Sequence, residues 1–290
     1  MKNFIKHCIK TLLKWKTLKP LISISPGHFY SPIVSRSEVD EFEKLIWNDD
    51  EPQGVDLNTS YQKDLIEEFN KNYEEIPFFC SNPQNRFFFE NGLFEQSDAF
   101  FLYSFLRHFC PENVIEVGSG FSSALMLDTK DAFLKEIDLT FIEPYTDVLF
   151  SLFRNDDLEK CRVVQDKVQN VEVETFKKLK KNDILFVDSS HVSKTGSDVN
   201  FILFKVLPVL NSGVIIHFHD IFYPFEYPKD WVYGGRNWNE CYILRAFLSY
   251  NSDFEILVFS DYLHKHHPEL FERIPMLKKN TGGSLWIRKK

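Results

Sequence analysis

The chain has 290 residues, of which 43% are hydrophobic and 26% charged, and its net charge is −8. This composition excludes wholesale disorder, and the length allows one large α/β domain with an appendage. Six of the 34 basic residues fall within residues 1–20, which hold no acid. The rest of the chain contains 28 basic and 42 acidic residues, which gives it a net charge of −14. Such an acidic body excludes general nucleic-acid binding, because it offers no broad basic surface for phosphates.

The cysteines and the hydrophobic runs indicate a cytoplasmic protein. No Cys-x-x-Cys pair occurs among the five scattered cysteines, which are Cys8, Cys80, Cys110, Cys161 and Cys241. An odd number without pairing motifs is typical of reduced thiols and excludes a disulfide framework or a zinc site. The sequence contains no run of about 18 apolar residues, so we expect no transmembrane helix.

Residues 1–19 predict a basic amphipathic helix. Apolar residues fall on one face and lysines on the other, and Lys6, Lys10 and Lys14 interrupt any hydrophobic region of a signal peptide. Two uses fit this pattern. The helix is suited to peripheral contact with an anionic membrane, and equally to packing on its own domain or on a second subunit of a homo-oligomer.

The rest of the N-terminal third predicts further helices without a self-sufficient core. Ser37 is expected to cap a helix that runs to about Trp47, with Asp40 in the capping-box position. A second helix, capped by Thr59 or Ser60, is expected to run to about residue 75, before Pro77. We therefore divide the chain into an N-terminal amphipathic helix and helical cap or lid, residues 1–95, and a second domain, residues 96–290.

From residue 97 onward, strand and helix patterns alternate regularly. Strands are expected at residues 113–117, 139–143, 162–165, 183–188, 213–220, 254–259 and 283–288. Helices are expected at residues 98–109, 122–130, 147–154, 171–180, 198–207 and 240–249. This alternation predicts an α/β fold, a Rossmann-like, mostly parallel sheet of seven strands with helices on both faces.

The stretch from Glu116 to Ser123 is the centre of this pattern. A buried strand ends in Glu116-Val117, and Gly118 and Gly120 allow a tight turn. Ser122 or Ser123 can cap the next helix. A strand, a glycine turn and a helix start form a cradle for a nucleotide-type cofactor.

Five successive strands of the predicted sheet each end at or beside an acid. The acids are Glu116, Glu143, Asp166, Asp188 and Asp220. Because the carboxyl ends of parallel strands meet at one edge, these acids form a strongly negative rim. Such a rim favours a cation or a cationic cofactor.

The segment Glu116–Gly120 resembles the first motif of the class I S-adenosylmethionine-dependent methyltransferases. The resemblance covers roughly residues 97–290 and implies S-adenosylmethionine as the cofactor. It implies that Glu116, Gly118, Ser119, Gly120 and Ser122 cradle the cofactor, with Ser122 in place of the third glycine. Glu143 stands where that family binds the ribose hydroxyls, and Asp166 where it reaches the adenine.

Two alternatives to a methyltransferase stay open. A nicotinamide-dependent dehydrogenase shares the Gly-x-Gly turn, but its third glycine would fall at Ser123 and Glu116 would lie near a pyrophosphate. The other alternative is a non-catalytic S-adenosylmethionine-binding scaffold protein.

A second stretch, residues 186–198, resembles the Asp-Gly-Asp-His segment of the small-molecule O-methyltransferases that include macrolide-sugar enzymes. The resemblance implies Asp188 and Asp220 as ligands of a divalent metal such as magnesium, and His191 as the catalytic base beside Asp188. The chain departs from the pattern at Ser190, which replaces the second Asp, and at His219, which precedes Asp220. These departures suit a softer metal, with His219 as a third ligand, or no metal.

The expected activity is transfer of a methyl group to a small-molecule acceptor, through a hydroxyl. An imidazole with a pKa near neutrality, such as that of His191, can take the hydroxyl proton. The aromatic and proline-rich stretch of residues 221–231 predicts either a wall of the acceptor pocket or a surface that packs on the N-terminal cap.

Overall fold

A computed structural model describes residues 23–71, 73–76, 85–278 and 280–290. The predicted helix at residues 1–19 lies outside them. The described residues fall into two compact units, residues 23–49 with Lys229–Asn237, and Asp50–Pro228 with Trp238–Lys290. Within the described ranges, no helix is long and apolar enough to cross a membrane.

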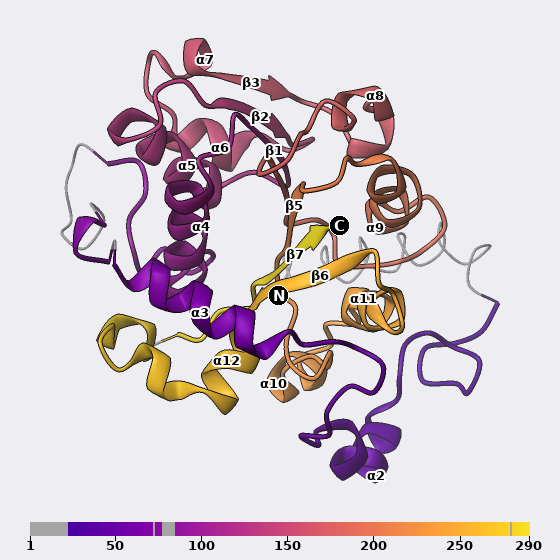
Figure 1. Ribbon diagram of the computed structural model, residues 1–290. Coiled ribbons are helices and arrows are strands. Elements are labelled where there is room, and N and C mark those ends of the chain that lie inside the picture. Colours follow the sequence, from indigo (N-terminus) through magenta and orange to yellow (C-terminus); the bar gives the residue numbers. More distant parts are fainter. Residues whose placement is uncertain (1–22, 72, 77–84, 279) are drawn as a thin grey trace, which may run out of the picture. The chain divides into compact units, whose positions relative to one another are not determined.

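The larger unit contains one sheet of seven strands, as predicted (Figure 1). The strands are β1 Asn113–Val117, β2 Asp138–Ile142, β3 Cys161–Val164, β4 Ile184–Val187, β5 Ile215–Phe218, β6 Phe254–Phe259 and β7 Leu285–Lys289. Their order is β3-β2-β1-β4-β5-β7-β6, and only β7 runs antiparallel to its neighbours. This confirms the predicted Rossmann-like fold.

Strand register brings the functional loops together. Val117 of β1 pairs with Ile142 of β2 and Val187 of β4, and Val187 pairs with Phe218 of β5. The four strands therefore end level with one another. The residues that follow them emerge at one edge of the sheet, where ligands bind in folds of this type.

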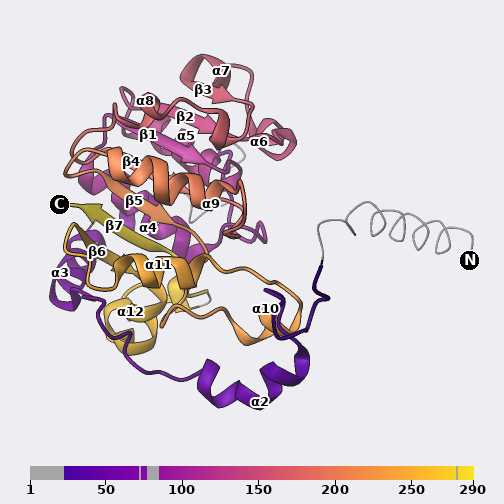
Figure 2. The same ribbon diagram turned by 90° about the vertical axis from the view of Figure 1, so that its right-hand side faces the viewer.

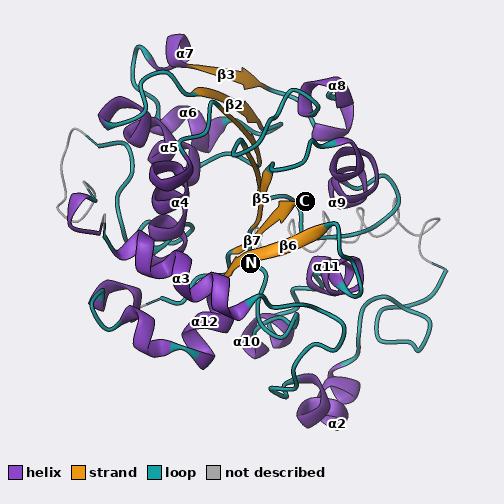
Figure 3. Cartoon of the chain, viewed as in Figure 1, coloured by secondary structure: helices purple, strands orange, loops and turns teal. Residues whose placement is uncertain are grey.

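Helices flank the sheet on both faces, α4 and α5 on one side and α9 and α11 on the other (Figures 1 and 2). Figure 3 shows the strands enclosed between these helices. The α-helices of this unit are α3 Thr59–Asn70, α4 Gln96–Phe109, α5 Phe121–Ala132, α6 Asp147–Leu152, α7 Asp157–Lys160, α8 Val173–Phe176, α9 Asp198–Phe201, α11 Glu240–Leu248 and α12 Ser260–His266. Shorter 3-10 or π turns are η2 Tyr73–Glu75, η3 Val168–Asn170, η4 Ile202–Val206, η5 Leu207–Val209, η6 Pro268–Phe271 and η7 Pro275–Lys278.

Two predicted helices are shorter than expected. The helix at residues 171–180 is reduced to α8, because the chain turns around Asp183, whose carboxylate accepts from the main-chain nitrogens of Lys180 and Asn113 (both 2.8 Å). The helix at residues 198–207 breaks into α9, η4 and η5, where Pro208 lies within the last turn.

The helix starts in the N-terminal third also differ from the predictions. Helix α2 spans Arg36–Ile46, and its cap is Ser35, which forms a capping box with Glu38. The predicted cap Ser37 with Asp40 is therefore wrong, because the longer glutamate side chain reaches the cap nitrogen two residues earlier. Helix α3 follows Asn58, whose left-handed backbone (φ 51°) starts the helix without a side-chain cap.

Helix α3 belongs to the larger unit and covers the edge strand β6. Asn58 Nδ2 donates to the carbonyl of Ile256 (2.9 Å), and Gln62 Oε1 accepts from the nitrogen of Phe259 (2.7 Å). These side chains satisfy main-chain groups that an edge strand would otherwise expose. The unit boundary at Asp50 thus places α3 in the same unit as the sheet. The lid role for residues 1–95 stays a prediction.

The smaller unit joins α2 to α10 (Lys229–Tyr233). Lys229 pairs with Glu43 (2.5 Å), and the Tyr233 hydroxyl donates to Asp40 (2.6 Å). Tyr233 also stacks on Trp47 at a centroid distance of 6.0 Å. The end of the 221–231 stretch therefore packs on an N-terminal helix, which is one of its two predicted uses.

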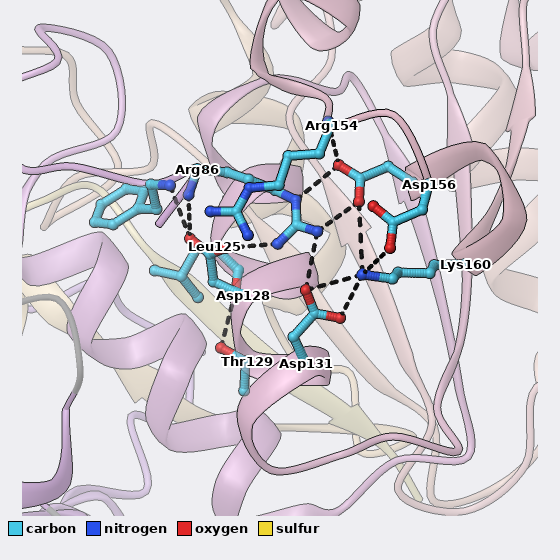
Figure 4. A network of polar contacts seen from close by, with 10 residues as sticks. Arg86, Leu125, Asp128, Thr129, Asp131, Arg154, Asp156 and Lys160 are labelled. Carbon is cyan, nitrogen blue, oxygen red and sulfur yellow. Dashed lines mark hydrogen bonds and ion pairs between the residues drawn. The ribbon is translucent and has the colours of Figure 1, made fainter. Parts of the chain in front are cut away.

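A buried arginine fixes the segment that leads to the site (Figure 4). The side chain of Arg86 is fully buried and pairs with Asp128 (2.7 Å), Asp157 (2.5 Å) and Asp131 (2.9 Å). The main-chain nitrogens of Arg86 and Phe87 also donate to Asp128 (2.7 and 2.8 Å). Residues 86–87 are thereby tied to the C-terminal half of α5. The ring of Phe88 lies 5.3 Å from that of Phe121, which holds the following segment near the start of that helix.

Candidate active site

The turn between β1 and α5 depends on one glycine. Gly118 has φ +84°, and a Cβ placed there would overlap the carbonyl oxygen of Asp188 and lie 2.7 Å from its carbonyl carbon. A Cβ at Gly120 would meet only Val148, at 3.8 Å. The ends of β1 and β4 can therefore approach this closely only with glycine at position 118.

Glu116 lies beneath this turn. Its carboxylate is fully buried and accepts hydrogen bonds from the hydroxyls of Ser122 (2.5 Å) and Ser123. Burial raises the pKa of Glu116 to about 8, against the effect of these hydroxyls. The sequence predicted that Glu116 contacts the cofactor directly. In the structure Glu116 and Ser123 lie beneath the turn and support it.

Glu143 lies at the mouth of the same turn. Its carboxylate accepts from the main-chain nitrogens of Ser119 (3.2 Å) and Tyr145 (2.6 Å). Asp166, in contrast, is exposed and accepts from the nitrogen of Lys167 (2.7 Å) and from Asn170 (2.8 Å), which lowers its pKa. Asp166 thus shapes η3, whose Val168 lines the cleft.

Two adjoining cavities of about 460 and 480 Å³ follow the carboxyl ends of the strands. Both are lined by Gly118, Glu143, Tyr145, Asp188, Ser189 and Ser190. The first extends over η3, and the second over the start of α5 and toward His191. The Ser189 hydroxyl is buried and has no hydrogen-bond partner among the described residues. Together the cavities form a cleft along the carboxyl ends of the strands. Their volumes suit a ligand the size of a nucleoside with an amino-acid tail, which is the class of the predicted cofactor.

His191 lies at the end of this cleft beside Asp188. Its Nε2 is 3.3 Å from Asp188 Oδ1, its Nδ1 is 2.9 Å from Glu240 Oε2, and its ring lies 4.4 Å from that of Trp238. Burial acts to lower the pKa of His191, but the hydrogen bonds with Asp188 and Glu240 raise it to about 10. The imidazole therefore carries a proton at neutral pH while Asp188 is its partner.

Comparisons of the sequence with known proteins identify one family. A family model described as a methyltransferase domain matches residues 115–221. An uncharacterised protein of Archaeoglobus fulgidus is 33% identical over 187 residues, which are 59% of this chain and 81% of that protein. The chain belongs to the S-adenosylmethionine-dependent methyltransferase family. This sets aside the nicotinamide-dependent dehydrogenase.

Several solved structures similar to the methyltransferase contain the cofactor or its product. The S-adenosylhomocysteine-bound methyltransferase PaMTH1 of Podospora anserina is 15% identical, with 93% of this chain and 99% of that chain covered and a TM-score of 0.41. The O-methyltransferase TomG of Streptomyces achromogenes, in complex with S-adenosylmethionine, is 14% identical, with 88% and 96% covered and a TM-score of 0.42. TM-scores below 0.5 leave the acceptor of this methyltransferase open.

Magnesium does not fit the side chains of the methyltransferase. His191 Nε2 lies 3.3 Å from Asp188 and 3.8 Å from Asp220, so an imidazole already occupies the space between the two predicted carboxylate ligands. His219 Nε2 is 3.7 Å from Asp220, and Ser190 Oγ donates to Asp198 (2.5 Å). Across the described ranges, no group of three or more His, Cys, Asp or Glu side chains could hold a metal ion. We therefore assign no part of the reaction to a metal ion.

Two residues of the methyltransferase site were missed by sequence reasoning. Trp238 lines the cavity beside His191. Glu240 forms a hydrogen bond with Nδ1 of His191, the ring nitrogen that does not face Asp188. The sequence feature that could have indicated Glu240 is its position at the start of the predicted helix 240–249, which follows the loop after the fifth strand. The aromatic residues Tyr223, Phe225 and Tyr227, predicted as one option to wall the acceptor pocket, are buried instead.

Proposed function

We propose that this methyltransferase transfers the methyl group of S-adenosylmethionine to a hydroxyl of a small-molecule acceptor, with His191 as the base. One observation carries the proposal. Asp188 and His191 stand 3.3 Å apart at the end of the cleft that begins at the glycine turn. A proton-accepting pair thus adjoins the cofactor cradle.

The cleft residues divide into a cofactor part and an acceptor part. Glu143 is suited to the ribose hydroxyls, and the Gly118–Gly120 turn to the amino-acid tail. When bound, S-adenosylmethionine supplies an electrophilic methyl group on a sulfonium. Most of the rate comes from alignment of the acceptor oxygen with that group, so the rigidity of the turn matters more than any single contact.

The hydroxyl proton passes to Nε2 of His191. An acceptor hydroxyl that enters between Asp188 and His191 removes the contact that contributes most to the raised pKa of His191. His191 then gives its Nε2 proton to water. The neutral imidazole accepts the hydroxyl proton on Nε2 as the carbon–oxygen bond forms and the carbon–sulfur bond breaks. Asp188, freed from the imidazole, orients the hydroxyl.

The acceptor part of the cleft combines a polar floor with apolar walls. The floor holds Asp188, His191 and Asp220. The walls are formed by Leu93, Phe94, Phe121, Val148 and Trp238. This lining suits an acceptor whose hydroxyl projects from an apolar or ring-shaped body.

A methyl-transfer assay tests the proposal. The full chain is incubated with S-adenosylmethionine carrying a tritiated methyl group and a panel of phenols, catechols and glycosides. With the best acceptor of the panel, we expect His191→Gln to lower turnover at least 100-fold while the affinity for S-adenosylmethionine stays within about threefold. His266→Gln, at an exposed histidine of α12, should keep full turnover. Undiminished turnover in His191→Gln would end the proposal for the base.

A further inference from the structure

Glu240 is a buried acid in direct contact with the proposed base. It occupies the first position of α11 and is 1% exposed. Its Oε2 lies 2.9 Å from His191 Nδ1, while its Oε1 has no hydrogen-bond partner in the described part of the chain. Burial raises the pKa of Glu240, and the hydrogen bond with His191 opposes this. A buried carboxylate of this kind is costly unless its partner is cationic or donates a hydrogen bond.

The start of α11 also holds the backbone of His191. His191 has a left-handed backbone (φ 56°), which is unfavourable for a residue with a side chain. Its carbonyl accepts from the main-chain nitrogens of Asn239 (3.1 Å) and Glu240 (3.2 Å). Asn239 Oδ1 in turn accepts from the nitrogen of Ser193 (2.6 Å). The start of α11 therefore holds the loop in its unfavourable conformation through several hydrogen bonds. Backbone strain that is held in place in this way is common at functional sites.

The charged groups around the imidazole lie on two sides. Asp188 and Asp220 approach Nε2 from the cleft at 3.3 and 3.8 Å, with His219 beyond Asp220. Among the described residues, the acid that approaches Nδ1 is Glu240, at 2.9 Å. Trp238 covers one face of the ring and limits the access of water. The two ring nitrogens thus have different partners, one in the cleft and one in the interior.

We propose that Glu240 is a positioning residue that holds the proton of His191 on Nδ1 and directs Nε2 toward the acceptor. The inference rests on the proposed function of His191 as the base. An imidazole accepts a proton in a defined direction only when its second nitrogen is fixed as a donor, and a buried carboxylate fixes it most strongly. Glu240 also stabilises the imidazolium that forms during the reaction.

Nuclear magnetic resonance tests this without any acceptor. The full chain is labelled with ¹⁵N-histidine and saturated with S-adenosylhomocysteine, and the imidazole N–H signals are recorded. We expect a far-downfield Nδ1–H signal, assigned to His191 by its absence in His191→Gln. The signal should persist in Asn239→Ala, which removes a bond to the loop but leaves the Glu240 contact. In Glu240→Gln it should move upfield or exchange away.

Turnover provides the second measurement, with the best acceptor of the panel. Glu240→Gln should lower kcat at least tenfold and leave the affinity for S-adenosylmethionine within about threefold. Because Glu240 acts through His191, adding Glu240→Gln to His191→Gln should lower kcat no further. The double variant removes the buried carboxylate of Glu240 together with its imidazole partner, which protects the test against failure to fold.

The outcomes separate this inference from the proposed function. An unchanged downfield signal in Glu240→Gln, or an additive loss in the double variant, would overturn the role of Glu240 and leave the methyltransferase intact. Full turnover in His191→Gln would instead overturn the base. A loss of kcat in Glu240→Gln accompanied by an equal loss of cofactor affinity would reduce Glu240 to a purely structural residue.

Discussion

The substitution Gly118→Ala tests the turn on which the cleft depends. The left-handed backbone at Gly118 disfavours alanine by about 1–2 kcal/mol. The added Cβ would also overlap the carbonyl oxygen of Asp188, and relief of such overpacking costs about 1–3 kcal/mol. We therefore expect the free energy of unfolding to fall by about 2–5 kcal/mol. Because Asp188 must move, its contact with His191 should be lost as well.

Urea unfolding followed by circular dichroism measures this effect. Gly120→Ala is the matched control, because its Cβ would meet only Val148 at an ordinary contact distance and its φ is −174°. We expect the control to stay within about 1 kcal/mol of the wild type. If Gly118→Ala proved as stable as Gly120→Ala, the close approach of β1 and β4 would be refuted as the reason for the glycine.

Further predictions concern the buried charges. Arg86→Met leaves Asp128 and Asp157 buried without their partner and should lower the free energy of unfolding by about 3–5 kcal/mol. The control Lys160→Met, at the partly exposed edge of the network, should lower it by less than about 1 kcal/mol. Equal losses for the two variants in urea unfolding would contradict this prediction. For Glu116, a folded-state pKa raised to about 8 from 4.5 means that stability present below pH 4.5 is lost as the pH rises through 8. Glu116→Gln should remove this pH dependence, so that its free energy of unfolding rises relative to that of the wild type by a few kcal/mol between pH 5 and pH 8.5. Parallel plots of the free energy of unfolding against pH for the two proteins would argue against this prediction.

The fold was predictable because its signals are local and repeated. The apolar runs that became β1 and β6 have the predicted bounds, and alternation with helices indicates a parallel sheet whatever the exact helix ends. The helix ends were less predictable. The helix expected at 171–180 failed because Asp183, three residues beyond it, draws the chain into a turn through its carboxylate. Periodicity contains no information on such a competitor.

The site was predictable only in part, for a similar reason. Glu143, Asp188 and His191 follow strand ends, and strand ends meet in space, so their gathering follows from the fold. Whether a carboxylate faces the cleft or the interior depends on neighbouring side chains. Glu116 turns inward to Ser122 and Ser123, and Glu240 reaches His191 across 49 residues of sequence.

Isothermal titration calorimetry with S-adenosylmethionine tests the central claim most directly. The full chain should bind one equivalent, and Glu143→Ala should weaken binding at least tenfold, because Glu143 lines both cavities and holds the nitrogens of Ser119 and Tyr145. Glu136→Ala, at an exposed acid before the opposite end of the same strand, should bind as the wild type does. Absence of binding by the wild type, or equal affinity in Glu143→Ala, would contradict the assignment of this cleft to the methyl donor.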